Sequence, residues 1–403
     1  MGAADLDKIL ADATEEKEED IQYMDTGNVG LDLALTDGLG LPIGASVLLW
    51  ALPGVGKTTV IGDMCKRLLA LHKDEPFKIL YLDVENSSIL LRTMGLRKSK
   101  NFILINEGLC WRQIEEFYKA ILEKKPGWED IKVVVIDSVS QIPSDQNLKK
   151  SVADGDYGTK ARERNAFYCK MLPRCKEAGI SNFFISQARQ KQDASPFEDP
   201  FKAAVSNVDL HNVDVILKCT AKTNSTDASK IEEATVFGTD KVVEKFILVM
   251  DSKAKNRFFK GNSVEMMIEK GKKVHNYYTV RKMLEGNKYI KANSGWYTFN
   301  QDLCAGLNLP ETKMRLSEIN KEVNKHLYMF IDILKSAGKY RVGLKEDEVI
   351  IDNGEPFPEG DAFYKDESPE RVTIEDAPIE DTPIEDAPKS KSKKASTKRK
   401  SAK

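Results

Sequence analysis

Short runs of apolar residues alternate along this chain with longer segments in which apolar residues recur every three or four positions. The short runs predict buried β-strands and the periodic segments predict helices. We expect strands at 45–50, 78–83, 102–105, 132–137, 181–186, 213–219 and 244–250, and helices at 59–72, 111–124 and 159–178. This alternation indicates an α/β fold with a mainly parallel sheet that is covered on both faces. The loops that follow the strands then share one edge of the sheet, where ligands bind.

The pattern divides the chain into four parts. Residues 24–285 form the α/β core, and residues 286–342 form a small α-rich lobe in which Glu311 to Ser336 reads as one long helix that ends at Gly338. Residues 1–23 form an N-terminal arm. Within this arm, apolar residues at helical spacing in 3–19 predict a short amphipathic helix that packs against another surface. A frayed acidic tail is the alternative for the same residues.

The last part, 343–403, is a charged tail. Acidic residues dominate as far as Asp386, and the triplet Ile-Glu-Asp repeats every five residues from Ile374. Such a segment buries too little apolar area to offset its ordering entropy, so we expect it to be disordered. The residues from Lys389 to Lys403 are rich in Lys and Arg. An acidic block before a basic end is typical of an interaction tail, and a purely solubilising tail is the alternative.

The clearest chemical signal lies between the first core strand and the first core helix. The segment Ala51-Leu-Pro-Gly-Val-Gly-Lys-Thr-Thr59 follows an apolar run and opens a helical one, which is the context of a phosphate-binding P-loop. Glycines turn backbone N–H groups toward an anion, and the helix N-terminus adds partial positive charge. Lys57 reaches the β- and γ-phosphates, and the hydroxyl of Thr58 coordinates Mg²⁺. The nucleotide-binding residues expected here are Pro53, Gly54, Val55, Gly56, Lys57, Thr58 and Thr59.

Bulk properties narrow the class further. Of 403 residues, 41% are hydrophobic, which is enough to form a hydrophobic core, and the formal net charge is −2. The six cysteines show no metal-ligand spacing and read as reduced thiols. No apolar run approaches the length of a membrane span, and the acidic N-terminus is unlike a signal peptide. We therefore expect a cytoplasmic ATPase or GTPase that has no membrane partner.

Carboxylates at two further strand ends complete a nucleotide-hydrolysing site. Asp137 ends an apolar strand, and in a P-loop fold such an aspartate supports the Mg²⁺ shell. Glu85 follows the strand that ends at Asp83, and an acid there can deprotonate the attacking water. We assign Glu85 as the catalytic base and keep Asp83 as the alternative. The alternative for Asp137 is an ordinary aspartate at a strand end, and the alternative for Asp83 and Glu85 is a helix-capping role.

Two polar loops leave the same edge of the predicted sheet. Gln187 ends a third apolar strand, where it can hydrogen-bond a γ-phosphate or the lytic water and relay the state of ATP to the next loop. That loop and an earlier one carry basic residues with exposed Phe, which suits single-stranded nucleic acid, although two solvated loops without a ligand would look the same. The candidate DNA-binding residues are Lys149, Lys150, Lys160, Arg162, Arg164, Arg189, Phe197 and Phe201.

These segments, taken in order, resemble the RecA recombinase family of bacteria and phages. The lead-in from Thr26 to Gly44, the Glu after the second strand, the Val-Ile-Asp-Ser strand, the Gly155-Asp156 loop and Ser186-Gln187-x-Arg189 all follow the family's order. Asn293 to Tyr297 looks like its Gly-x-Trp-Tyr segment. The resemblance covers about residues 24 to 340 and has the divergence of a phage-encoded relative of the UvsX type.

The resemblance implies a RecA-like P-loop ATPase core and a set of roles. Lys57 and Thr58 bind phosphates and Mg²⁺, Asp137 supports the metal, Glu85 is the base and Gln187 senses the γ-phosphate. Two lysines act on a neighbouring protomer's nucleotide in that family. Lys253 matches one of these positions. The other is Asp251 here, and Lys255 or Arg257 is the candidate substitute. In bacterial relatives an aromatic residue at the position of Leu90 stacks on adenine. The family also has a glycine pair in the second loop, which this chain lacks; Ala203 and Ala204 lie nearby.

The implied activity is that of an ATP-dependent recombinase. It would form helical filaments on single-stranded DNA, pair them with double-stranded DNA and act with a single-strand-binding or mediator protein in a bacterial or phage-infected cell. The N-terminal arm would serve oligomerisation. Two alternatives share the same core residues: a hexameric helicase, and a nucleotide-gated protein that coats DNA as a mediator and scarcely hydrolyses ATP.

Overall fold

The computed structural model describes residues 21–144, 159–191, 200–205, 207–222, 245–254, 263–304, 307 and 309–337. Several expectations from the sequence lie outside these ranges: the amphipathic helix at 3–19, the tail at 343–403, and the candidate residues Lys149, Lys150, Phe197 and Lys255. Lys253 is described in its backbone alone.

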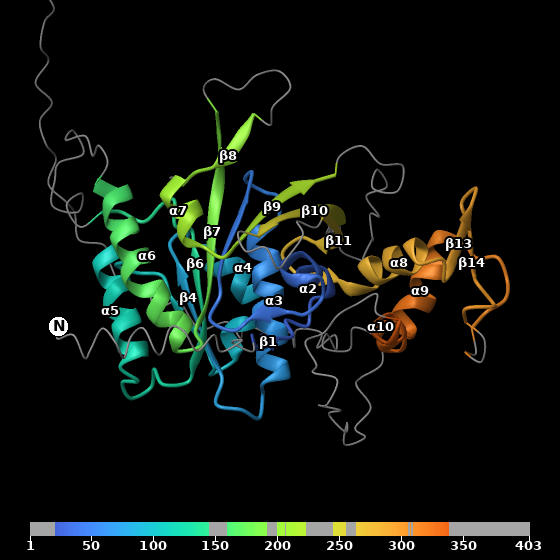
Figure 1. Cartoon of the computed structure of the whole chain (residues 1–403), viewed down its shortest axis with the longest axis horizontal. Coiled ribbons are helices and arrows are strands. Elements are labelled where there is room, and N and C mark those ends of the chain that lie inside the picture. The colour runs from blue at the N-terminus through green and yellow to red at the C-terminus, as the bar shows by residue number, and fades with distance from the viewer. Residues whose placement is uncertain are drawn as a thin grey trace, which may run out of the picture. The chain divides into compact units, whose positions relative to one another are not determined.

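A large, mostly parallel sheet forms the centre of the α/β core, as the sequence predicts (Figure 1). Its strand order is β12-β11-β10-β9-β3-β7-β6-β4-β5, with β8 paired to β7. The strands from β9 to β5 in this order are parallel, and β10, β11 and β12 add an antiparallel extension. The strands are β3 (Ser46–Ala51), β4 (Lys78–Asp83), β5 (Phe102–Ile105), β6 (Ile131–Asp137), β7 (Ser181–Gln190), β8 (Phe201–Ala203), β9 (Val215–Ala221), β10 (Lys245–Ala254), β11 (Ser263–Glu269) and β12 (Lys273–His275).

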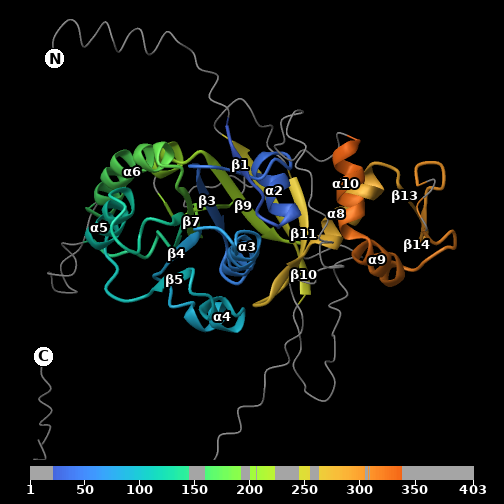
Figure 2. The same ribbon diagram turned by 90° about the horizontal axis from the view of Figure 1, so that it is seen from below.

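Both faces of this sheet are covered by helices. On β6, Val133 and Val135 face one apolar cluster while Val134 and Ile136 face the other, and all four are buried. This is why a central parallel strand reads as a continuous apolar run. The first cluster includes α2 (Val29–Thr36), α3 (Lys57–Leu71) and α4 (Ser88–Thr93), and the second includes α5 (Trp111–Leu122), α6 (Thr159–Glu177) and α7 (Asn207–Asn212). Figure 2 shows α3 and α4 on one side of the sheet and α5 and α6 on the other.

The helix α3 is fastened to the antiparallel extension at both of its ends. Near its start, the backbone N–H of Gly271, in the turn between β11 and β12, donates to the Thr59 hydroxyl at 3.1 Å. Near its other end, the buried Arg67 donates to the Val274 carbonyl at 2.9 Å and pairs with Asp63 at 2.8 Å. Strands β11 and β12 therefore hold the helix that begins at Lys57.

A glycine turn before α2 packs against the same arginine. Gly27 has φ +70°, and a Cβ there would lie 2.9 Å from the Cβ of Arg67. The turn is fixed by Asn276, whose side-chain amide donates to the Gly27 carbonyl at 2.9 Å. A short antiparallel pair, β1 (Tyr23–Met24) and β2 (Leu41–Pro42), closes the segment that contains α2.

The lobe consists of three helices and one hairpin around its own apolar cluster. Its elements are α8 (Asn276–Gly286), β13 (Ile290–Asn293), β14 (Trp296–Phe299), α9 (Leu316–Lys325) and α10 (Leu327–Ser336). Helix α8 packs on β11 but gives Val280 and Leu284 to the lobe cluster, so a boundary at residue 286 cuts off a helix that belongs to both parts.

The prediction of a single long helix from Glu311 to Ser336 is wrong. His326 leaves helical geometry, with φ −111° and ψ 28°, and separates α9 from α10. The segment before α9 is not helical either, because Met314 and Tyr297 exchange backbone hydrogen bonds at 2.8 and 2.9 Å. Apolar spacing continues across the break through Val323, Leu327 and Phe330, so periodicity could not reveal it.

No helix within the described ranges is long and apolar enough to cross a membrane.

Candidate active site

The glycine-rich loop that the sequence predicts to bind phosphate lies between β3 and α3. Gly54 and Gly56 adopt φ +78° and +95°, the left-handed region that favours glycine. Gly56 precedes the first helical residue, Lys57, and Val55 is buried while Pro53 and Gly54 are exposed. The loop thus presents its backbone at the N-terminus of α3, where N–H groups and the helix dipole favour an anion.

Lys57 folds over this loop. Its Nζ donates to the carbonyls of Ala51 and Leu52, each at 3.2 Å, and the side chain is buried. Burial lowers the pKa of Lys57, while the nearby Glu85 and Asp137 oppose that shift. The ammonium is thus held at the mouth of the loop beside two acids.

Asp137 is the centre of a buried hydrogen-bond cluster. Its Oδ2 accepts from the Thr58 hydroxyl and from the Tyr81 hydroxyl, each at 2.9 Å. Burial, followed by the charge of Glu85, raises the pKa of Asp137 to about 6. The fold therefore brings the two residues predicted for metal binding, Thr58 and Asp137, into direct contact.

The donor set of this cluster fits Mg²⁺. Oδ1 of Asp137 is buried and has no hydrogen-bond partner among the described residues. Mg²⁺ prefers oxygen ligands and is usually bound through one or two carboxylates together with substrate phosphates. The described residues contain no group of three His, Cys, Asp or Glu side chains able to hold a metal alone. Thr58 and Asp137 therefore fit a metal ion that arrives with a nucleotide.

Glu85 lies at the junction of three strand ends. Its Oε1 accepts from the Gln187 amide at 2.7 Å and from the Gln141 amide at 3.1 Å. Its backbone N–H donates to the Asp137 carbonyl at 3.0 Å. The strand register explains this convergence, because Asp83 pairs with Asp137 across β4 and β6, and Ala51 pairs with Gln187 across β3 and β7.

Asp83 has a different environment from Glu85. It is fully buried, and its Oδ1 accepts from the backbone N–H of Ser87 at 2.8 Å, just before α4. Burial raises the pKa of Asp83. The Asp83 carboxylate therefore holds the backbone just before α4, whose N-cap residue is Ser87. Asp83 is thus less suited than Glu85 to act on a solvent-derived water.

The strand that carries Gln187 continues into a hairpin. β7 extends to Gln190 and pairs antiparallel with β8, so that Arg189 lies opposite Lys202 and Gln190 lies opposite Phe201. The expected strand ended at 186, four residues before the end of β7. Figure 1 shows β8 beside the C-terminal part of β7. Arg189 and Lys202 are exposed and Phe201 is half-buried.

The other candidate DNA residues lie at the start of α6. Arg162 is exposed and Lys160 is half-buried. Arg164 is 7% exposed, so it is the least accessible of the candidate DNA residues that the structure describes, and its contact to DNA stays a prediction. The hydroxyl of Thr59 accepts from the backbone N–H of Gly271, and a contact between Thr59 and the nucleotide stays a prediction.

Four residues that the structure places in this region were not predicted from the sequence. Tyr81 is two positions before Asp83 and thus on the same strand face, which was a usable signal. Gln141, Gly271 and Lys202 meet the site from separate elements, and no local pattern marks them. Leu90, expected beside the adenine, packs on the first apolar cluster, and a Cβ at Gly271 would lie 3.0 Å from its Cδ1.

Fold and site together define a P-loop nucleotide-binding protein, with the glycine loop, the Thr58–Asp137 pair and Glu85 along one edge of a parallel sheet. The RecA N-terminal domain family matches residues 7–202. Protein RecA from Laribacter hongkongensis (strain HLHK9) is 24% identical over 284 residues, which cover 70% of this chain and 73% of that protein. Both matches support a RecA-type recombinase family for this chain.

Proposed function

We propose that this protein is an ATP-dependent DNA recombinase that assembles into filaments on single-stranded DNA and catalyses homologous pairing and strand exchange. The observation that carries the proposal is the hydrogen bond between Gln187 and Glu85. It joins the acid proposed as catalytic base to the strand that leads directly into the candidate DNA hairpin. The similarity to a family of DNA-dependent ATPases supports the same activity.

The proposed hydrolysis gives each group of the candidate site a separate role. The loop from Pro53 to Gly56 and the ammonium of Lys57 bind the phosphates of ATP, and Thr58 and Asp137 hold Mg²⁺. When bound, Mg²⁺ neutralises the charge that develops on the phosphate oxygens. Glu85 accepts the proton of the attacking water, and Gln141 and Gln187 hold its carboxylate in position.

The hairpin supports DNA binding through its charge pattern. Arg189 and Lys202 lie directly opposite each other on paired strands, and like charges in that position destabilise a sheet. A polyanion such as single-stranded DNA would remove this repulsion. Gln187 lies two residues from Arg189, so DNA bound at the hairpin would act on Glu85 through one strand. Lys253 and Lys255 remain candidates for contacts to a neighbouring protomer's nucleotide.

The test is ATP hydrolysis with and without single-stranded DNA, with electron microscopy of the same samples. We expect DNA to stimulate hydrolysis and to produce extended helical filaments, and strand exchange between homologous DNA molecules would follow. Closed rings that unwind duplex DNA would replace the proposal with the hexameric helicase. Filaments on DNA with scarcely any hydrolysis would favour a nucleotide-gated coating protein.

A further inference from the structure

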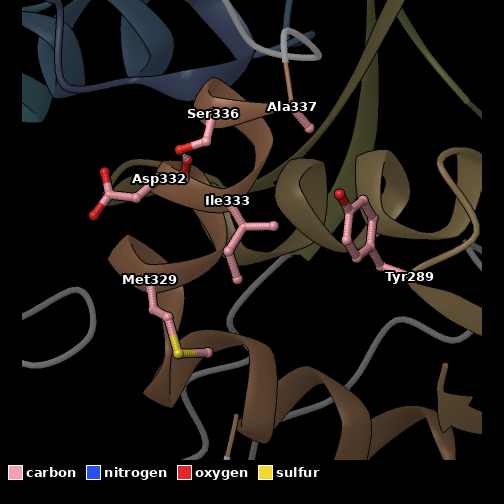
Figure 3. A pocket seen from close by; sticks show the side chains of 6 residues that line it. All are labelled: Tyr289, Met329, Asp332, Ile333, Ser336 and Ala337. Atoms are coloured by element: carbon pink, nitrogen blue, oxygen red, sulfur yellow. Dashed lines mark hydrogen bonds between the residues drawn. The ribbon is translucent and has the colours of Figure 1, made fainter. Parts of the chain in front are cut away.

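A groove on the lobe lies apart from the nucleotide and DNA site. It has a volume of about 670 Å³ and is lined by Tyr289, Met329, Asp332, Ile333, Ser336 and Ala337. Five of these residues come from the outer side and the end of α10, and Tyr289 comes from the segment between α8 and β13 (Figure 3). The groove therefore runs along the last helix that the structure describes.

The floor of the groove is apolar and its rim carries one negative charge. Tyr289, Met329 and Ile333 are half-buried, so each still offers apolar surface. Asp332 is exposed and is the one carboxylate among the six lining residues. The Ser336 hydroxyl donates to the Asp332 backbone carbonyl at 2.8 Å, which leaves that carboxylate available. The groove thus suits an apolar segment that carries cationic residues.

The chain itself supplies such a segment directly after the groove. Ala337 lines the groove, and the next residues are Gly338-Lys-Tyr-Arg-Val-Gly-Leu-Lys345. Tyr340, Val342 and Leu344 alternate with Lys339, Arg341 and Gly343, so an extended backbone would place the three apolar side chains on one face. The segment carries three cations and no acid before Glu346.

The connection also allows the chain to reverse. Gly338 follows the end of α10, and a glycine at this position is the usual means by which a helix ends and the chain turns back. From Ala337 back to Met329 the helix spans about 12 Å at about 1.5 Å per residue. Residues 339–344 cover about 20 Å when extended at about 3.3 Å per residue. The segment is therefore long enough to run the length of the groove.

We propose that residues 339–345 fold back along α10 and occupy this groove. Tyr340, Val342 and Leu344 cover Tyr289, Met329 and Ile333, and Lys339 or Arg341 pairs with Asp332. The acidic part of the chain then begins at Glu346 from a fixed point on the lobe, instead of from the end of α10. This inference does not depend on the function proposed above.

Thiol protection tests the proposal on the full-length protein. Cys169 is the exposed cysteine among the six and is first replaced by serine, and the other five are buried. In that background Met329→Cys is alkylated with iodoacetamide in three chain lengths: ending at Lys403, at Lys345 and at Ala337. We expect slow alkylation in the first two and a rate at least fivefold higher in the third. Equal rates in all three would overturn the proposal.

Disulfide trapping identifies the occupant. Val342→Cys is combined with Met329→Cys, or with Lys335→Cys as a control on α10 outside the groove lining. We expect the 329–342 pair to form an intrachain disulfide at least fivefold faster than the 335–342 pair, and Asp332→Lys to slow it. A disulfide between two chains would show that the groove joins copies, and equal rates for both pairs would show that the segment has no preferred site. Either result overturns the proposal.

Discussion

Gln187 donates its side-chain amide to the carboxylate of Glu85 at 2.7 Å, although 102 positions separate the two residues in the sequence. Gln187 lies on β7, which continues into the β7–β8 hairpin, and Glu85 follows β4. One hydrogen bond thus joins the proposed DNA-binding hairpin to the proposed base. Most of our predictions concern this connection.

Replacing Glu85 by Gln should abolish turnover and leave binding intact. The amide keeps the size of the side chain but cannot accept a proton, so we expect DNA-stimulated ATP hydrolysis to fall by about 10²- to 10⁴-fold. Phosphate release measures turnover, and a fluorescent ATP analogue measures affinity. Asp83→Asn is the control, and it should lower thermal stability more than turnover, since the Asp83 carboxylate accepts from the backbone N–H of Ser87 just before α4. An unchanged rate in Glu85→Gln would exclude Glu85 as the base.

Replacing Gln187 by Ala should uncouple hydrolysis from DNA. The basal rate should persist, because Gln141 still donates to Glu85 at 3.1 Å. The ratio of rates with and without single-stranded DNA should fall toward one. The matched control is Gln141→Ala, which removes the other amide on Glu85 and should keep the stimulation ratio. If both variants keep full stimulation, the signal from DNA takes a different route.

The pH dependence of stability should report on Asp137. An aspartate has a pKa of about 3.9 in an unfolded chain, and that of Asp137 is raised to about 6 in the fold. The folded protein therefore binds the proton more tightly, so this group's contribution to the free energy of unfolding falls as pH rises from about 4 to about 6. Above that window the ionised, buried carboxylate costs about 3 kcal/mol, from about 1.4 kcal/mol per pKa unit.

Asp137→Asn removes this titration and keeps an oxygen that can accept from Thr58 and Tyr81. Without nucleotide, we expect the variant to exceed the native chain in stability at pH 8 and to lose that advantage near pH 4.5. Urea unfolding at the two pH values measures the difference. A constant difference between the two proteins would show that Asp137 does not titrate as described.

Binding to single-stranded DNA should depend on the exposed pair of the hairpin. We expect Arg189→Ala with Lys202→Ala to weaken binding, and the slope of log affinity against log salt to become shallower by about 0.7 for each phosphate that the variant no longer neutralises. Fluorescence anisotropy at several salt concentrations measures both quantities. Arg164→Ala is the comparison: because that residue is buried, it should lower the unfolding temperature and leave the salt slope unchanged. A salt slope that does not change in the double variant would remove the hairpin from the DNA site.

The sequence predicted the core well because parallel strands buried on both faces form continuous apolar runs. The expected strands at 78–83 and 102–105 match β4 and β5 residue for residue. The antiparallel strands β11 and β12 and the short helix α4 were not predicted, because the first two alternate with charged residues and the last has six residues. Local spacing carries little information about elements that depend on contacts made far along the chain.

The candidate site also contains residues whose positions the sequence predicts and residues whose positions it does not. Lys57, Thr58, Glu85 and Asp137 stand at strand ends or in a recognisable loop, so their positions follow from the order of elements. The partners that hold them do not follow, because Gln141 and Gly271 come from turns that the tertiary fold brings in. Arg164 shows a second limit of prediction from sequence, because nothing in the residues around it indicates that the fold buries its side chain.

Gly27 supplies no chemical group to ATP or DNA, yet it has little freedom to change. Any side chain there would push against Arg67, which fixes the far end of the helix that starts at Lys57. In a saturation mutagenesis screen for ATP-dependent growth or activity, position 27 should therefore be as intolerant as the P-loop glycines. Such a screen alone would class a steric spacer, 30 positions before Lys57 in the sequence, among the nucleotide-binding residues.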